Sequence, residues 1–158
     1  MINRHYNKDR HRELLDYQEM SRKKGKSLKK EFKEKNSELT DYIIIVYCHL
    51  NWEMKDEFLE LFKEFLEKNI SSFQFCGTLE KKLKLNENLS DDTLLSDNFC
   101  TIDPKADRFT DFIDDLLLTC EICDRNPEPL RLRGYIGEME LREQIRETFF
   151  ELQKFLEK

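Results

Sequence analysis

Two amphipathic patterns in the last third of the chain, residues 107–158, constrain the fold most strongly. The first repeats at steps of three and four residues through Phe109, Phe112, Ile113, Leu116, Leu117, Cys120 and Cys123. The second repeats in the same way through Leu141, Ile145, Thr148, Phe149, Leu152 and Leu156. This spacing places each set on one face of a helix. Pro127 and Pro129 interrupt the chain between the two patterns. We therefore expect two helices that bury their apolar faces by packing side by side.

Two further stretches upstream carry helical patterns. From Lys55 to Asn69, a stripe of Phe and Leu is interleaved with Glu and Lys, which predicts an amphipathic helix. Ser71 or Ser72 is a suitable N-cap for another helix, which is expected to end at about Leu85. These elements add two helices to the C-terminal pair.

The stretch from Asp41 to Trp52 fits two secondary structures. Its Ile and Val residues are typical of a strand, but no partner strand is evident elsewhere in the sequence. Because a lone strand leaves its backbone groups unpaired, a buried helix capped by Thr40 or Asp41 is favoured.

Residues 86–105 are expected to be the loosest part of the domain. Ser90 is a candidate cap for one or two helical turns, and Asp103 with Pro104 is expected to end whatever precedes them. In residues 130–136, apolar residues partly alternate with arginines, and this stretch is interpreted as a short extended segment packed against the bundle. Together these patterns predict an all-α fold, a compact antiparallel bundle of about five helices.

Charge divides the chain into two parts. Residues 1–36 carry twelve Lys or Arg against six Asp or Glu, a net charge of +6, whereas residues 37–158 carry a net −12. The apolar residues of the first part, Leu14 and Leu28 among them, are spaced too thinly for a buried face. We therefore predict a basic N-terminal arm at 1–36, partly helical or disordered, followed by an acidic helical-bundle domain at 37–158.

The arm has two interpretations. It is either a solvated tail or a contact for RNA or for an acidic protein surface. The cations assigned to such a contact are Arg22, Lys23, Lys24, Lys26, Lys29 and Lys30.

Signals for catalysis are weak. The sequence has no glycine-rich phosphate loop, nucleophile elbow or HExxH motif. Cys120 and Cys123 form a CxxC pair, but no second Cys or His couple accompanies them as a zinc site requires. Both fit the apolar stripe, so core packing is favoured over metal or redox chemistry. His49 is interpreted as a core or boundary histidine and not as a catalytic one. We predict no catalytic residue, no metal and no cofactor.

Acidic residues are the remaining candidates for function. Those predicted to line one end of the C-terminal helix pair are Asp114, Glu121, Asp124, Glu128, Glu138 and Glu140. Such a surface suits a basic protein partner. Two alternatives stay open: the acids occupy ordinary solvated helix faces, or, in the case of Glu138 and Glu140, they stabilise a helix N-terminus.

Three stretches resemble the colicin D-type immunity proteins. They are Phe65 to Cys76 (FLEKNISSFQFC), Leu117 to Glu121 (LLTCE) and Glu138 to Arg142 (EMELR). The likeness spans roughly residues 55–158, and the N-terminal arm lies outside it. The chain also resembles uncharacterised reading frames of algal plastids.

The resemblance implies a helical bundle that inhibits a tRNA-cleaving toxin domain by covering its basic cleft, without catalysis. The acids that match are Glu121, Asp124 and Glu128, with Glu138 and Glu140 nearby. The chain departs from the family in its greater length and its basic arm. An alternative function is that of an accessory subunit, anchored by the arm in a larger ribonucleoprotein or membrane-associated assembly.

Composition also bears on the compartment. No apolar run reaches the ~20 residues that span a bilayer, and the N-terminus lacks the apolar segment of a secretory signal. The five cysteines show no regular spacing and are expected to be reduced. We expect a soluble protein of a bacterial cytoplasm or an organelle stroma. The scarcity of Ala and Gly is typical of an AT-rich coding genome and favours a plastid.

Overall fold

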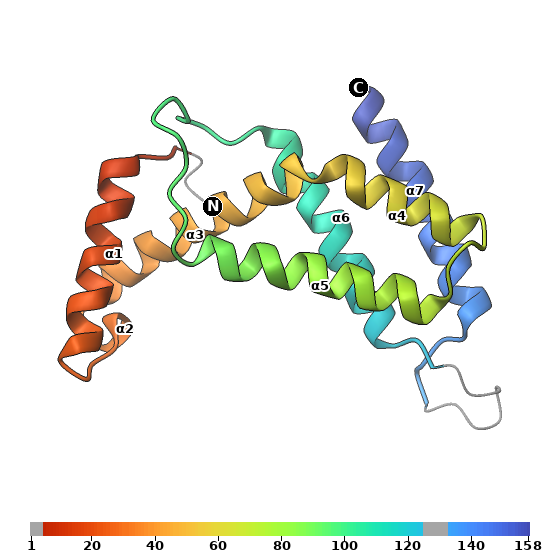
Figure 1. Ribbon diagram of the computed structural model, residues 1–158, viewed down its shortest axis with the longest axis horizontal. Coiled ribbons are helices and arrows are strands. Elements are labelled where there is room, and N and C mark those ends of the chain that lie inside the picture. Colours follow the sequence, from red (N-terminus) through yellow and green to blue (C-terminus); the bar gives the residue numbers. More distant parts are fainter. Residues whose placement is uncertain (1–4, 125–132) are drawn as a thin grey trace.

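The computed structural model describes residues 5–124 and 133–158, and these residues form seven helices (Figure 1). The helices are α1 (Lys8–Lys23), α2 (Leu28–Glu31), α3 (Lys33–Glu53), α4 (Lys55–Leu66), α5 (Ser72–Ser90), α6 (Pro104–Glu121) and α7 (Glu138–Glu157). Within the described ranges, β pairing is limited to two isolated bridges, His5 with Thr101 and Cys123 with Ile136. The all-α class is therefore confirmed, although the described part of the chain has more helices than the five expected.

The larger hydrophobic cluster lies among α4, α5, α6 and α7. Its fully buried aromatic residues are Phe58, Phe62, Phe65, Phe75 and Phe109. The rings of Phe65 and Phe75 stack with centroids 4.6 Å apart and join α4 to α5. Since each buried Phe contributes about 1.5–3 kcal/mol, this cluster supplies much of the stability. The predicted packing of the two C-terminal stripes is confirmed, because α6 and α7 are in contact through it.

A second cluster joins the N-terminal residues to α3. Leu14 of α1 and Leu28 of α2 are 0% and 4% exposed, and they pack in a cluster that includes Leu39 and Ile45 of α3. The expectation that apolar residues before residue 37 are too sparse for a buried face is wrong. The physical reason is that short helices need only one or two large side chains each when a long helix provides the rest of the cluster. The predicted extended basic arm is not confirmed.

Helix α3 belongs to both clusters. The prediction of a buried helix over residues 41–52 is confirmed, but the helix begins at Lys33, so neither Thr40 nor Asp41 caps it. The Thr40 hydroxyl instead donates a hydrogen bond to the Asn36 carbonyl oxygen at 2.8 Å. Because α3 contacts α1, α2, α5 and α6, apolar residues occur on several of its faces. This burial explains why its sequence lacks a clean helical period.

The ends of α5 and α6 correct two predicted boundaries. Ser71 caps α5 as expected, in a capping box with Gln74. Ser90 does not begin a helix but ends α5, where its hydroxyl donates to the Glu87 carbonyl oxygen. Asp103 caps α6, and Pro104 occupies its first turn, where a missing N–H costs nothing. The pair therefore starts a helix as well as closing the loop.

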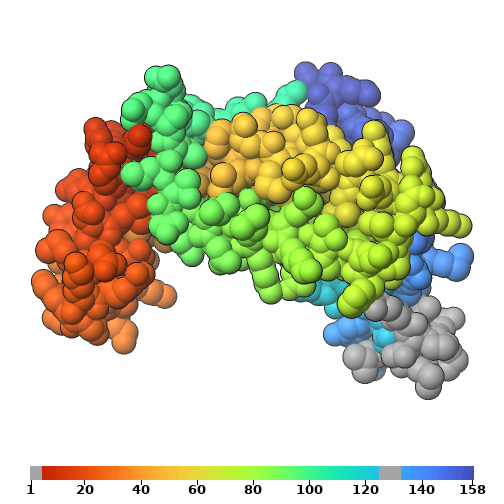
Figure 2. All heavy atoms as spheres, in the orientation of Figure 1, coloured from red at the N-terminus to blue at the C-terminus, as the bar shows by residue number. Residues whose placement is uncertain are grey.

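The shape follows from these contacts. Helices α1 and α2, residues 8–31, form an N-terminal lobe at one end of α3, while α4 to α7 gather around the other end (Figure 1). The space-filling surface is hollowed between the N-terminal lobe and α5 (Figure 2). No helix in the described ranges has the length and apolarity needed to cross a membrane.

Candidate binding groove

Helices α3, α5 and α6 enclose a groove with a volume of about 580 Å³. Its lining consists of Ile43, Ile44, Tyr47, Glu80, Leu83, Lys84, Glu87, Ser90, Asp91, Asp114, Leu117 and Glu121. A neighbouring hollow of about 410 Å³ shares three of these residues and extends the lining with Cys48, Asp107, Thr110 and Asp111. We call the two together the acidic groove.

The acidic groove combines an apolar floor with negatively charged walls. Ile43, Ile44 and Leu117 are half-buried and form part of the floor. Carboxylates line both walls, with Glu80 and Glu87 on α5, Asp91 at the C-cap of α5, and Asp107, Asp111, Asp114 and Glu121 on α6. Among the described residues, the lining contains one cation, Lys84, which is paired with Glu80 at 2.7 Å. The groove therefore carries a strong excess of negative charge.

Helical periodicity explains why the acids line up. On α5, the lining residues recur about one turn apart, from Glu80 through Lys84 and Glu87 to Asp91. On α6, the acids recur about two turns apart, from Asp107 through Asp114 to Glu121. Side chains three or four residues apart share a helix face. Each wall is thus a single acidic face of one helix.

Asp114 is one of two half-buried acids of this groove, the other being Asp107. The Tyr47 hydroxyl donates a hydrogen bond to Asp114 Oδ1 at 2.9 Å. Burial, together with the nearby charges of Asp111, Asp115 and Glu87, raises the pKa of the Asp114 carboxyl. A cation placed beside this carboxylate would relieve both effects.

A buried polar network beneath the groove fixes the three helices relative to one another. Asn86 of α5 donates to Asn51 Oδ1 of α3 at 2.8 Å, and Asn51 donates to Thr110 Oγ1 of α6 at 3.4 Å. All three side chains are buried. Because an unpaired buried amide is costly, the network resists displacement of any one helix.

The five predicted acids that the structure describes have different surroundings. Asp114 and Glu121 line the acidic groove. Glu138 lies elsewhere, where it accepts hydrogen bonds from the Ser72 N–H and from Arg142. The Asp124 backbone N–H donates to the Ile136 carbonyl oxygen at 2.7 Å, and Glu140 is exposed on the first turn of α7. Glu128 lies outside the described residues.

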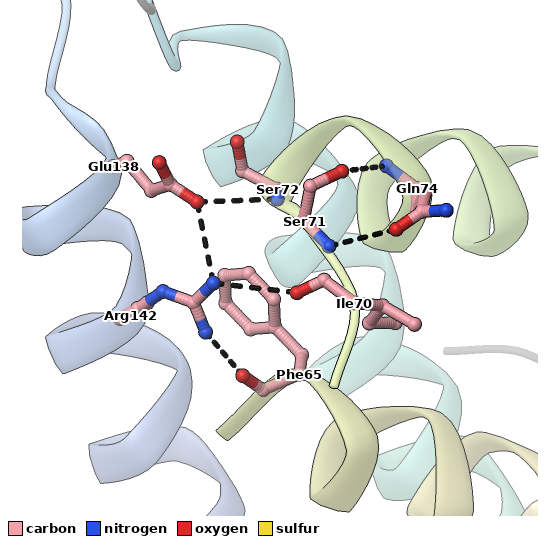
Figure 3. Close-up of polar contacts among 7 residues, drawn as sticks. All are labelled: Phe65, Ile70, Ser71, Ser72, Gln74, Glu138 and Arg142. Atoms are coloured by element: carbon pink, nitrogen blue, oxygen red, sulfur yellow. Dashed lines mark hydrogen bonds and ion pairs between the residues drawn. The ribbon is translucent and has the colours of Figure 1, made fainter. Parts of the chain in front are cut away.

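Glu138 has a structural role at the turn between α4 and α5 (Figure 3). The Arg142 guanidinium lies 4.0 Å from the centre of the Phe65 ring. It donates hydrogen bonds to the carbonyl oxygens of Phe65 and Ile70 and to Glu138. These bonds attach the start of α7 to the turn, so Glu138 is engaged within the protein.

The predicted cations gather at the turn between α1 and α2. Arg22, Lys23, Lys24, Lys26, Lys29 and Lys30 are all exposed, and we call this set the basic turn. Gly25 in its middle has φ +70°, a conformation that favours glycine. Arg22 is paired with Glu19 at 3.4 Å. Buried Leu28 and a hydrogen bond from Ser21 to Glu31 anchor the turn to the lobe.

No family model, curated protein or solved structure matches this chain.

Cys120 is buried in the larger cluster, and Cys123 packs against it, as the apolar stripe predicts. A hydrogen bond with Cys76 and burial both raise the pKa of the Cys120 thiol, which keeps it from forming a nucleophilic thiolate. Among residues 5–124 and 133–158, no three His, Cys, Asp or Glu side chains are grouped to hold a metal. His49 is half-buried, with its ring 4.8 Å from that of Phe99.

Sequence reasoning missed five of the seven acids of the groove. Glu80, Glu87 and Asp91 occupy the polar face of α5, where acids are usually solvated. Their recurrence on one helical face was the available signal. Nothing in the sequence, however, indicated that α6 would bring its own acids opposite them.

Proposed function

We propose that this chain is a non-catalytic protein-binding module that takes a cationic protein partner in the acidic groove. The observation that carries the proposal is the pairing of seven carboxylates with one lysine around a partly apolar floor. Like charges so arranged repel one another, and a cationic ligand relieves that repulsion. The apolar floor adds area that can be removed from water on binding.

The chemistry of the groove suits the binding of a partner better than catalysis. The pKa of Asp114 is raised, but its contact is Tyr47, whose own pKa is raised by burial. Catalytic sites commonly pair a general acid with a second group that acts as base or nucleophile. The described groove offers carboxylates, hydroxyls and a buried thiol at Cys48, whose pKa burial raises to about 12. This set favours charge complementarity over catalysis.

The basic cleft of a tRNA-cleaving toxin domain is the specific partner that we propose. This part rests on the resemblance to the colicin D-type immunity proteins. Of the acids that the resemblance assigned, Glu121 lines the groove. Binding there would place the acidic walls against the cations with which such a toxin holds its RNA.

Charge reversal in the groove tests the proposal. Glu87→Lys with Glu121→Lys changes two exposed acids that line opposite walls. Glu147→Lys with Glu157→Lys is the matched control, because it makes the same charge change on exposed sites of α7. Each variant is titrated with an inactivated toxin domain and used to capture partners from the native source.

We expect the groove variant to lose at least about tenfold in affinity, equivalent to about 1.4 kcal/mol. The control should bind as the wild type does. Equal binding by the groove variant would contradict the proposal. If the protein fails to bind the toxin domain but captures another basic protein through the groove, the protein-binding function stands and the toxin domain is not its partner.

The basic turn supports a second candidate function, that of an accessory subunit that contacts RNA. Six exposed cations lie within residues 22–30, on a turn held in place by Leu28. Lys23→Gln, Lys24→Gln and Lys26→Gln remove three charges without touching a buried residue. If the turn binds single-stranded RNA, the salt dependence of log K should become shallower by about 2. An unchanged slope would exclude this role.

A further inference from the structure

The acidic groove is bounded entirely by helices, and this limits what can lie in it. Backbone N–H and C=O groups within α3, α5 and α6 are bonded inside their own helices. They offer no sheet edge to which an extended segment could add. An extended chain over the floor at Ile43, Ile44 and Leu117 would bury backbone groups without partners. A helix satisfies its own backbone and presents only side chains.

The dimensions of the walls set a length for that helix. Asp107 to Glu121 covers about 21 Å of α6, and Glu80 to Asp91 covers about 16 Å of α5, at 1.5 Å per residue. A partner helix of about 11–14 residues has the same length.

Charge on both walls sets the composition of the partner. Acids of α5 and acids of α6 face the groove from opposite sides, while the apolar residues lie between them. A complementary helix therefore carries an apolar stripe with Lys or Arg on both flanks. Long cationic side chains suit this arrangement, since their methylene stems pack on apolar surface and their charged ends reach the walls.

We infer that the partner segment held in the acidic groove is an amphipathic helix with cations on both sides of an apolar stripe. The inference rests on the proposed function and specifies its ligand. Asp114 lies at the point that the two hollows share, with Tyr47 bonded to Oδ1. Asp114 is the acceptor for a central cation of that helix.

The basic turn of a second copy is a poorer occupant. Its six cations match the charge of the groove, but Leu28, the apolar residue among residues 22–30, is buried in its own lobe. It has no apolar side chain to place on the floor. A second copy is therefore treated as an alternative outcome of the test.

The experiment uses three peptides of about 14 residues with the full-length protein. The first repeats Leu at helical spacing with Lys and Arg flanking it. The second has the same composition and charge, with Leu and cations alternating as in a strand. The third replaces the cations of the first with Glu. Binding is measured by isothermal titration calorimetry, and peptide helicity by circular dichroism.

We expect the first peptide to bind at least about tenfold more tightly than the second, because only its apolar stripe reaches the floor as one face. Its helicity should rise on binding, and the acidic peptide should not bind. Asp114→Asn should lower the affinity for the first peptide about tenfold. The Glu147→Lys, Glu157→Lys control should leave its affinity unchanged.

Three results would overturn the inference. Equal affinities of the first two peptides, both lost in the Glu87→Lys, Glu121→Lys variant, would reject the helix and keep the proposed function. Binding that survives this variant would reject the groove and both proposals. Concentration-dependent self-association of the protein alone, lost in the same variant, would identify a second copy as the occupant.

A panel in which no peptide binds would also reject the helical ligand. The proposed function would then be judged by the toxin titration and the captured partners, which do not depend on peptide conformation.

Discussion

His11 is a buried neutral histidine that ties the N-terminal residues to the loop before α6. The Tyr6 hydroxyl accepts a hydrogen bond from the Leu95 N–H at 3.1 Å. We therefore infer that the hydroxyl donates its own proton to the unprotonated Nδ1 of His11, 2.7 Å away. The ring of His11 also stacks on Tyr42, with centroids 5.4 Å apart. Its Nε2 is buried and has no partner among the described residues. Burial lowers the pKa of His11 to about 4.

This lowered pKa predicts a loss of stability in mild acid. The unfolded chain takes up the proton near pH 6.5, whereas folded His11 does so only near pH 4. The stabilisation is therefore complete above pH 6.5 and declines as the pH falls toward 4, by on the order of 3 kcal/mol. Urea unfolding between pH 7 and pH 4 measures this change.

His11→Phe is the control for that measurement. It keeps an aromatic ring against Tyr42 and should cost about 1 kcal/mol at pH 7, through the lost hydrogen bond of Tyr6. The difference between wild type and variant should shrink and then change sign as the pH falls, because the variant lacks the histidine whose protonation destabilises the wild type. A difference that stays constant would assign the acid sensitivity to other groups.

The pH dependence of stability that comes from Asp114 has the opposite sign to that from His11. Because its pKa is raised, the folded protein holds the proton to a higher pH than the unfolded chain, and stability falls as the pH rises through that window. Asp114→Asn removes this penalty and keeps an acceptor for Tyr47. The melting temperature at pH 7 should therefore stay constant or rise. The corresponding gain in the free energy of unfolding should not exceed about 1 kcal/mol. A marked fall would show that the carboxylate itself stabilises the fold.

At the scale of elements, α4 ends in a left-handed cap that carries an unfavourable residue. Lys68 has φ +63°. The Lys68 N–H donates to the Phe65 carbonyl oxygen and the Asn69 N–H donates to the Glu64 carbonyl oxygen, which is the Schellman pattern. Lys68→Gly should raise the free energy of unfolding by about 0.5–1 kcal/mol. Lys68→Ala removes the same charge and should give no gain. Chemical denaturation of the two variants compares them directly.

Arg142 connects the start of α7 to the turn before α5 (Figure 3). Arg142→Met keeps part of the stem over Phe65 but removes the guanidinium donor from the carbonyl oxygens of Phe65 and Ile70, at a cost of about 2 kcal/mol. The Phe65 carbonyl oxygen retains its bond from the Lys68 N–H. Arg146→Met is the matched control, since Arg146 is exposed and pairs with Glu143; its cost should stay below about 0.5 kcal/mol. Similar thermal unfolding of the two variants would contradict the role of Arg142.

The elements with one buried face were predictable, and those with several were not. The stripes of α4 and α7, and that of α6 from Phe109 onward, each face one cluster, so their apolar period survives in the sequence. Helix α3 packs on five other helices, and its apolar period is lost. Ser90 is a good cap in isolation, but its hydroxyl bonds inward to Glu87 and closes α5. Asp114 and Glu121 were identified, whereas the acids of α5 became part of the groove only through tertiary packing.

At the scale of the whole molecule, the N-terminal lobe is part of the core. Leu14 and Leu28 pack with Leu39 and Ile45, which lie beyond the sequence boundary at residue 36. Deletion of residues 1–36 should therefore expose this cluster and cost several kcal/mol, at about 1.5–3 kcal/mol for each large apolar side chain. A lower melting temperature and binding of a hydrophobic dye report the change. The Lys23→Gln, Lys24→Gln, Lys26→Gln variant should melt as the wild type does.

The basic turn lies at one end of the molecule, and the acidic groove lies between α3, α5 and α6. This separation gives the protein a permanent electric dipole moment. A cationic partner diffusing nearby would exert a torque on that dipole and turn the open side of the groove toward itself before contact. Orientation during the encounter would thus raise the association rate, an advantage that disappears once added salt shortens the Debye length below about 8 Å.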